Sequence, residues 1–190
     1  MSIIQVVGFD PSLRHWGIAR GAYCTTTKKL TIQHLSVVEP EIPTGKQVRQ
    51  NSKDLHAAHQ LMVAAMSAAK GAAALFVEVP VGSQSARAMA GYAICVGVLG
   101  AIRAQGIPFY EVTPTETKVI ATGKKTATKS EMISWATTQH PEADWPYYYR
   151  NNEQLISEAK AEHMSDAVAT IYAGIAGNQF QQALHQIALL

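Results

Sequence analysis

Short apolar runs separated by polar breaks divide the chain into an α/β pattern. Residues 3–9 are largely apolar and β-branched, and this run ends at Asp10, before a Pro-Ser pair. Such a run predicts a strand that is buried on both faces, near the centre of a sheet. Residues 74–79 repeat this form, with an acid, Glu78, close to the end. The pattern therefore predicts two buried strands that each end in a carboxylate.

Weaker apolar patterns predict the remaining elements. Partial alternation over residues 16–23 and 29–38 indicates two strands that form an antiparallel meander with the first, and residues 107–112 indicate another strand. Apolar residues at helical spacing, together with Gly and Pro breaks, predict the helices. The helices are expected over residues 53–69, 88–105, 114–121, 128–138 and 154–174, followed by a short helical segment that contains Phe180 and Leu184.

Two of these helices have faces that can be assigned. In 53–69, the helical spacing of Leu55, Met62 and Val63 predicts that they lie on one side. The helix over 88–105 is apolar on nearly all sides, which is typical of a buried helix. Small residues at its surface permit close backbone contact, so it either packs on the sheet of its own domain or is shared between two subunits.

The polar connections carry most of the basic and aromatic residues. Residues 39–52 predict a surface loop, and residues 122–128 predict a basic loop that contains Lys124 and Lys125. The spacing of Thr128 and Glu131 predicts a capping box at the start of the next helix.

A further connection, residues 140–152, is rich in Pro, Trp and Tyr and is predicted to be irregular. Its aromatic side chains could stack on unpaired bases, although packing within the loop is the more usual role of such residues.

Composition limits the classes of protein that fit the sequence. The 190 residues, of which 47% are hydrophobic, suffice for a single domain over residues 1–190. A net charge of +2 does not by itself establish nucleic-acid binding. The cysteines, Cys24 and Cys95, lie far apart in apolar segments, which indicates buried thiols in a reducing compartment. We see no signal peptide and no membrane span, so a cytoplasmic location is expected.

The acidic residues are the candidates for a catalytic site. Asp10 and Glu78 emerge on one edge of the sheet if their strands are adjacent, and a helix that crosses this edge could present His163 and Asp166 together. The sequence does not decide whether Glu162 or His163 points inward. Clustered carboxylates repel one another unless divalent cations neutralise them, and oxygen ligands suit Mg²⁺ or Mn²⁺. Two such ions support phosphodiester cleavage.

The ordered motifs resemble a known family. Gly8-Phe9-Asp10-Pro11-Ser12 with Gly17, Phe76-Val77-Glu78, and His163-Met164-Ser165-Asp166-Ala167 look like the motifs of the RuvC-type Holliday-junction resolvases, with a phage-type member among the options. The resemblance covers about residues 3–175. It implies a ribonuclease H-like α/β fold, in which a mixed five-stranded sheet, an antiparallel meander followed by parallel strands, has helices on both faces.

The resemblance also implies an activity and a site. Family members are homodimers that use Mg²⁺ or Mn²⁺ to nick symmetric strands of a four-way DNA junction. The resemblance implies that Asp10, Glu78, His163 and Asp166 form the catalytic and metal site, with two ions. Lys118 and Lys129 match lysines of a DNA-contacting region. With Lys124 and Lys125 they are the predicted DNA-binding residues, since cations contact phosphate without reading sequence.

One departure from the family pattern leaves the substrate open. Bacterial members carry an aromatic residue three positions after the acid of the fourth strand, where this chain has Val81. A broader branched-DNA nuclease therefore remains an alternative to a strict junction resolvase. Two functions of different classes also remain open, namely an ATPase or kinase of the actin-like fold and a catalytically silent DNA-binding module.

Overall fold

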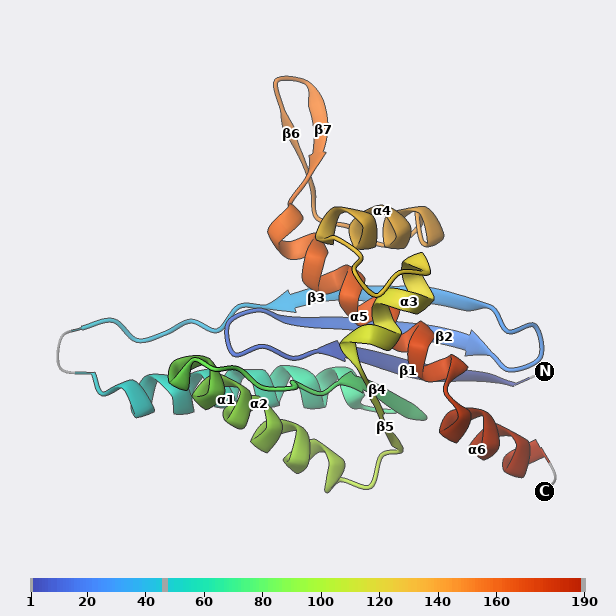
Figure 1. Cartoon of the computed structure of the whole chain (residues 1–190), viewed down its shortest axis with the longest axis horizontal. Coiled ribbons are helices and arrows are strands. Elements are labelled where there is room, and N and C mark those ends of the chain that lie inside the picture. The colour runs from blue at the N-terminus through green and yellow to red at the C-terminus, as the bar shows by residue number, and fades with distance from the viewer. Residues whose placement is uncertain (1, 46–47, 189–190) are drawn as a thin grey trace.

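The computed structural model describes residues 2–45 and 48–188, and its centre is one mixed sheet (Figure 1). Strands β1 and β2 and strands β2 and β3 pair antiparallel, whereas β4 pairs parallel with both β1 and β5. The predicted meander followed by parallel strands is confirmed. Along the sheet, the strands are β3 (Leu30–Val38), β2 (Trp16–Cys24), β1 (Ile3–Asp10), β4 (Ala74–Glu78) and β5 (Phe109–Val112).

Helices cover both faces of this sheet, as expected. On one face, α5 runs across the strands and carries α3 and α4 above it, while α1 and α2 lie on the opposite face (Figure 1). A separate hydrophobic core fills each interface. The helices are α1 (Gln50–Ala69), α2 (Ala86–Arg103), α3 (Pro114–Thr122), α4 (Lys129–Gln139), α5 (Glu158–Ala176) and α6 (Asn178–Ala188).

The alternation of side chains along β1 decides where its acid points. Val6 belongs to the core beneath α5, while Val7 and Phe9 belong to the core against α1 and α2. Because successive residues of a strand face opposite sides, Asp10 shares the α5 face with Val6. The same reasoning applies to β4, in which Phe76 lies beneath α5 and Glu78 follows two residues later.

Glycines let α5 lie unusually close to the sheet. A Cβ atom on Gly8 would clash with the backbone carbonyl of Ala167, and one on Gly17 would clash with the carbonyl of His163. Glycine is the residue that permits such a close backbone approach. The part of α5 that carries the candidate site is therefore held directly against β1 and β2.

The prediction of an irregular segment over residues 140–152 was wrong. Tyr147–Arg150 forms β6 and Glu153–Ile156 forms β7, and the two strands make an antiparallel hairpin outside the main sheet. Asn151 and Asn152 connect them with φ angles of 51° and 61°. Asn tolerates this conformation, and it is the conformation that a two-residue hairpin turn requires. As a result, α5 begins at Glu158, four residues later than expected.

The predicted face of α1 was partly wrong. Met62 packs against the core as expected, but Leu55 and Val63 are exposed, whereas Ala57, Leu61 and Ala65 are buried. The buried face is thus centred on Leu61 and the alanines, whose small side chains allow the helix to approach the sheet closely. The helix also begins three residues earlier than predicted, within the expected surface loop, of which residues 46 and 47 lie outside the described ranges.

Helix α2 is buried on one side only, which corrects the expectation of a buried helix. Cys95, Leu99 and Ile102 face the core, while Met89 and Val96 remain exposed. Within the described ranges, α2 is the helix that is long and apolar enough to span a membrane, with a mean hydropathy of 1.3 and 22% of the stretch buried. A single helix of this kind is weak evidence for a span.

Candidate active site

The structure places the two strand-end acids on neighbouring strands. Phe9 of β1 pairs with Val77 of β4, and the next residues of these parallel strands are Asp10 and Glu78. Both acids lie on the face covered by α5, as the alternation along each strand requires. The predicted juxtaposition of Asp10 and Glu78 thus follows from strand order and register.

Helix α5 adds the histidine and the third acid. A hydrogen bond of 2.7 Å joins His163 Nδ1 to Asp10 Oδ2. Gly17, which pairs with Asp10 across the sheet, packs against the backbone of His163 and allows this contact. Asp166 lies one turn further along α5 and is partly buried. Glu162 instead forms an ion pair with Lys129, so His163 is the residue that points into the site.

Burial and nearby negative charge raise the pKa values of Glu78 and Asp166. Burial, with a contribution from the charge of Asp10, raises the pKa of Glu78 to about 7. Burial and the charges of Asp10 and Glu78 raise the pKa of Asp166 well above its usual range. Asp10 in turn raises the pKa of His163 through the hydrogen bond that joins them. These shifts show that the three carboxylates influence one another in a poorly solvated place.

No Lys or Arg side chain pairs with the three acids in the described part of the chain, and the partner of Asp10 is His163. Within residues 2–45 and 48–188, no Lys or Arg forms an ion pair with Asp10, Glu78 or Asp166. In the same ranges, no group of three or more Asp, Glu, His or Cys side chains has an arrangement that could hold a metal ion. The donor set, three carboxylates and an imidazole, nevertheless fits Mg²⁺ or Mn²⁺, because it offers hard oxygen ligands with uncompensated negative charge.

Two contacts at the site were not foreseen from the sequence. The Thr117 hydroxyl, on α3, lies 2.9 Å from Glu78 Oε2 and donates a hydrogen bond to it. The ring of His15 stacks on that of His163, with 5.4 Å between the ring centres and 8° between the planes. The sequence signal for Thr117 was its place in the first turn of a helix that directly follows a strand next to β4. His15 itself is exposed.

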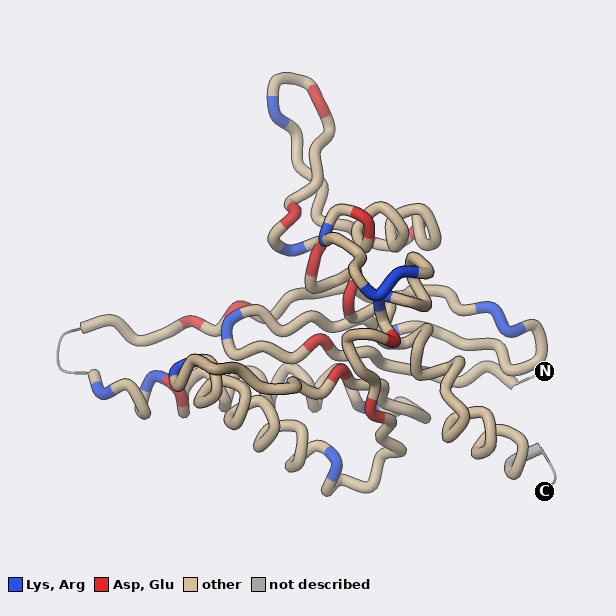
Figure 2. The backbone as a smooth tube through the Cα atoms, in the orientation of Figure 1, with Lys and Arg blue, Asp and Glu red and all other residues tan. Residues whose placement is uncertain are grey.

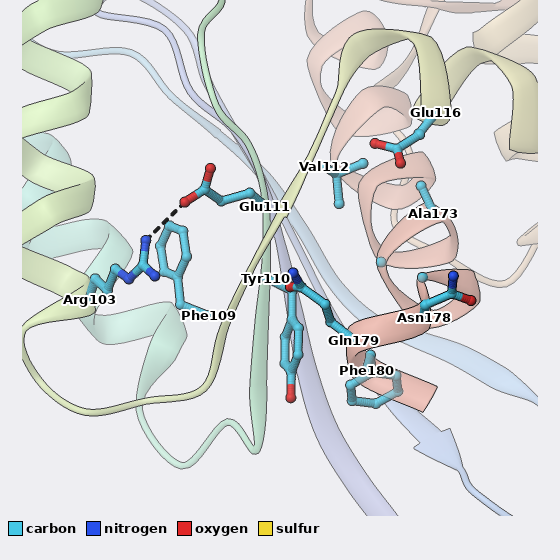
Figure 3. A pocket seen from close by; sticks show the side chains of 12 residues that line it. Arg103, Phe109, Tyr110, Glu111, Val112, Glu116, Ala173, Asn178, Gln179 and Phe180 are labelled. Atoms are coloured by element: carbon cyan, nitrogen blue, oxygen red, sulfur yellow. Dashed lines mark hydrogen bonds and ion pairs between the residues drawn. The ribbon is translucent and has the colours of Figure 1, made fainter. Parts of the chain in front are cut away.

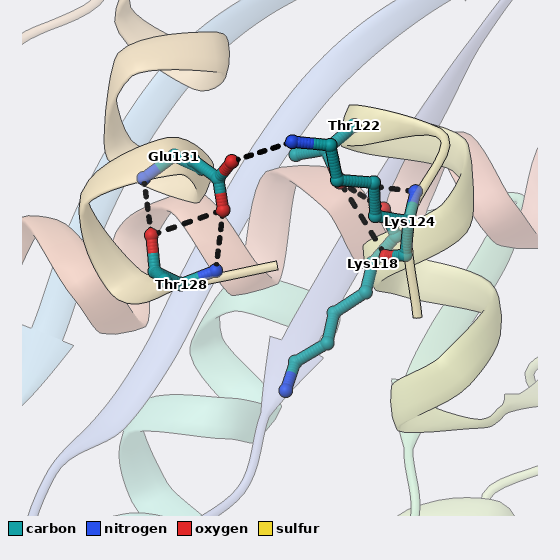
Figure 4. A network of polar contacts seen from close by, with 5 residues as sticks. All are labelled: Lys118, Thr122, Lys124, Thr128 and Glu131. Carbon is teal, nitrogen blue, oxygen red and sulfur yellow. Dashed lines mark hydrogen bonds and ion pairs between the residues drawn. The ribbon is translucent and has the colours of Figure 1, made fainter. Parts of the chain in front are cut away.

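The predicted DNA-binding lysines lie on the elements that cover α5. Figure 2 shows a basic segment between α3 and α4, the connection that contains Lys124 and Lys125. Lys124 pairs with Glu131, 2.9 Å away, and Glu131 also completes the predicted capping box with Thr128 (Figure 4). The side chain of Lys118 extends away from this network.

A pocket elsewhere on the molecule is separate from this site. It has a volume of about 470 Å³ and lies between β5, α3 and the start of α6 (Figure 3). Arg103 and Glu111 form an ion pair at one side, and Tyr110 and Phe180 line another. None of the four candidate catalytic residues contributes to its lining.

The loop after β4 places Val81, which is 80% exposed, away from the core.

Comparisons with known proteins agree with this architecture. No protein-family model and no curated protein sequence matches the chain. A structure of Thermus thermophilus RuvC in complex with a Holliday junction substrate superposes with a TM-score of 0.62 and 19% identity, covering 94% of this chain and 96% of that one. A second Thermus thermophilus RuvC structure gives a TM-score of 0.60 and 20% identity, covering 96% and 97%. The chain has the ribonuclease H-like fold of the RuvC structures, as its sequence motifs predicted.

Proposed function

We propose that this protein is a metal-dependent, structure-selective endodeoxyribonuclease that resolves four-way DNA junctions by paired nicks. The observation that carries the proposal is the convergence of Asp10, Glu78 and Asp166, without a Lys or Arg partner among the described residues, around His163. The comparison supports it, because a protein of the same fold is described in complex with a Holliday junction substrate. The low identity leaves the substrate of this chain to experiment.

The three carboxylates would hold two Mg²⁺ or Mn²⁺ ions. When bound, such ions activate water and stabilise the leaving oxygen in phosphodiester hydrolysis. Glu78 would enter this site with its orientation already fixed, since the Thr117 hydroxyl holds one of its oxygens. Asp166 would bind an ion as the carboxylate, and a bound ion would oppose the rise in its pKa that burial, Asp10 and Glu78 cause.

His163 has the position of a proton carrier or a further ligand. Its Nδ1 atom is engaged by Asp10, which fixes the ring and leaves Nε2 as the nitrogen available for this role. Stacking on His15 restrains the plane of the ring. These contacts place one imidazole at the edge of the acidic cluster in a defined orientation.

The remaining parts of the proposal concern DNA and a second subunit. Lys118, Lys124, Lys125 and Lys129 would contact phosphates, with Lys124 and Lys129 exchanging their acidic partners, Glu131 and Glu162, for DNA. The exposed side of α2, with Met89 and Val96 beside glycines that have open space around them, would form the contact of a homodimer. Two sites related by symmetry would nick symmetric strands.

Asp10→Asn is the test of this function. The variant should bind a synthetic four-way junction as the wild type does, but cleave it at least about 100-fold more slowly in saturating Mg²⁺. Parallel assays on flaps and linear duplex determine whether the nuclease is strict or broad. The matched control is Asp54→Asn, which removes a buried carboxylate elsewhere. Undiminished nicking by Asp10→Asn would refute the assignment, and absence of cleavage by the wild type would favour a silent DNA-binding module.

A further inference from the structure

The β6–β7 hairpin stands away from the rest of the molecule. It rises above α4, and its strands pair with each other rather than with the main sheet (Figure 1). Its base is firmly anchored, because Trp145 is 3% exposed and its indole N–H donates to the carbonyl of His140 at 2.8 Å. Ile156 packs on the core, and the Ser157 N–H donates to the Pro146 carbonyl at 2.9 Å. The hairpin is therefore an ordered projection.

Three consecutive tyrosines line one strand of this projection. Tyr147, Tyr148 and Tyr149 are 48%, 46% and 75% exposed, and none of them stacks on another ring among the described residues. Tyr147 and Tyr149 share one face of the hairpin, because residues two apart in a strand point the same way. Tyr148 shares the other face with Arg150. Both faces thus present an aromatic ring to solvent.

The hairpin is connected directly to the candidate active site. After β7, the chain enters α5 at Glu158, and His163 lies less than two turns further along this helix. Lys129, at the start of α4, pairs with Glu162 on the same turn of α5. The projecting tyrosines, the DNA-binding lysines and the carboxylates are thus all arranged around the N-terminal half of α5.

We propose that the hairpin tyrosines, Tyr149 foremost, stack on nucleobases that are unpaired at the branch point of the bound DNA. This inference rests on the proposed function. A tyrosine face stacks on any base, because every base has a π-face, and this suits a protein that recognises structure rather than sequence. The occupant follows from continuity with the phosphate-binding lysines and the acidic site. Arg150, on the opposite face from Tyr149, adds a cation for the backbone.

Substitutions at Tyr149 separate stacking from other roles. Tyr149→Ala should weaken binding to a four-way junction about 10-fold and leave binding to linear duplex unchanged, while Tyr149→Phe should bind as the wild type does. Tyr149→Leu keeps apolar area but has no π-face, so it should behave like Tyr149→Ala. Binding is measured in EDTA, which prevents cleavage, with 2-aminopurine beside the branch point. Its fluorescence change on binding should be lost in the Ala and Leu variants only.

A variant with a shortened hairpin tests the same inference independently of the substitutions at Tyr149. Tyr147 and Ile156 are cross-strand partners, so an Asn-Gly turn can join them in place of residues 148–155 while the anchored base is kept. This variant should unfold at the same temperature as the wild type and lose junction preference. Wild-type junction binding by the shortened variant, or by both Tyr149→Ala and Tyr149→Leu, would overturn the inference. So would wild-type binding by Tyr149→Leu together with a change in oligomeric state on sizing, which would indicate a protein partner.

The same experiment distinguishes failure of the inference from failure of the proposed function. If the wild type cuts junctions and the hairpin variants bind them normally, the nuclease assignment stands and the stacking role falls. If the wild type cuts no DNA but the variants lose junction binding and the 2-aminopurine signal, the stacking role stands and the nuclease assignment falls.

Discussion

Carboxylates on the two faces of the sheet have opposite electrostatic environments. On the α1–α2 face, Asp54 accepts two hydrogen bonds of 2.6 Å from the guanidinium of Arg87 and one from Gln50. These bonds hold the pKa of Asp54 below its usual value. On the α5 face, Glu78 and Asp166 have no such cation among the residues that the structure describes, and their pKa values are raised.

This difference distinguishes a carboxylate that stabilises the fold from carboxylates that are available to bind a cation. A carboxylate with a resident Arg is satisfied in the folded chain and needs nothing further. Clustered carboxylates without one destabilise the fold unless they are protonated or a cation arrives. The electrostatics of the α5 face therefore agree with the proposed binding of divalent ions there, and those of the α1–α2 face do not. Four experiments test this difference between the two faces.

The largest expected effect is on cleavage. Asp166→Asn should lower the rate of junction cleavage by about 100-fold or more, because it removes an ion-binding oxygen from the site. Asp54→Asn, which also neutralises a buried acid, should leave the rate within about 2-fold of wild type, since Asp54 lies on the face of the sheet away from the reacting groups. Single-turnover cleavage of a labelled junction measures both. Equal losses in the two variants would abolish the contrast.

The next effect concerns the close approach of α5. Gly17→Ala should lower the free energy of unfolding by about 1–3 kcal/mol and slow cleavage, because the new methyl group displaces the backbone of His163. Gly91→Ala on the core side of α2 is the matched control, since a Cβ there meets only the Leu13 side chain at 3.7 Å, an ordinary van der Waals contact. It should be neutral or stabilising by up to about 1 kcal/mol. Urea denaturation gives both values, and a neutral Gly17→Ala would show that α5 tolerates displacement.

The third effect depends on pH. Because the folded-state pKa of Glu78 is raised to about 7, the folded protein binds more protons than the unfolded chain between about pH 4.5 and 7. The metal-free protein therefore loses stability at this residue as the pH rises through that window. Glu78→Gln should remove this loss, so the variant should gain on the wild type by about 2 kcal/mol between about pH 5 and 8.

Thermal unfolding in EDTA measures the gain of Glu78→Gln, and repetition in Mg²⁺ supplies the control. Mg²⁺ should raise the melting temperature of the wild type at about pH 8 and raise that of Glu78→Gln less. A melting-temperature difference between the two proteins that stays constant with pH would contradict the assignment of a raised pKa to Glu78.

The smallest expected effect is on the stability that the Asp54–Arg87 ion pair contributes. Asp54→Asn should destabilise the protein by about 1 kcal/mol at about pH 7, since Asp54 is largely buried but 47% of the Arg87 side chain is exposed. The pKa of Asp54 is lowered by folding, so its contribution is present above about pH 4 and is lost as the pH falls below this. The variant and the wild type should therefore converge in acid, where urea denaturation can compare them.

Several features of the site could be predicted because they depend on local order along the chain. The acids at the ends of two similar apolar runs, Asp10 and Glu78, were recognisable before any strand order was known. His163 and Asp166 were recognisable as a helical pair three residues apart. The roles of Thr117 and His15 were not, because their contacts depend on how α3 and the β1–β2 turn pack around other elements. The sequence places Thr117 in the first turn of a helix and His15 in a turn, but it does not identify the partners of either residue.

The hairpin illustrates a missed local signal. Consecutive asparagines between two stretches of four residues were enough to indicate a two-residue turn, but the density of Tyr, Trp and Pro was interpreted as irregular structure. The faces of α1 were missed for a different reason. Amphipathic spacing favoured large residues such as Leu55, whereas the fold buries alanines, and only the distance between helix and sheet decides between them.

The amino-acid sequence was enough to predict the strands of the main sheet, the alternation that places Asp10 and Glu78 on one face, and the chemical type of the candidate ligands, because these depend on residue identity and on periods of about 2 and 3.6 residues. Tertiary structure alone decided that His163 rather than Glu162 turns inward, that Asp54 has a cation and Glu78 has none among the described residues, and that three tyrosines project into solvent. These outcomes depend on distances between segments far apart in the chain, and desolvation and Coulomb interactions are set by those distances.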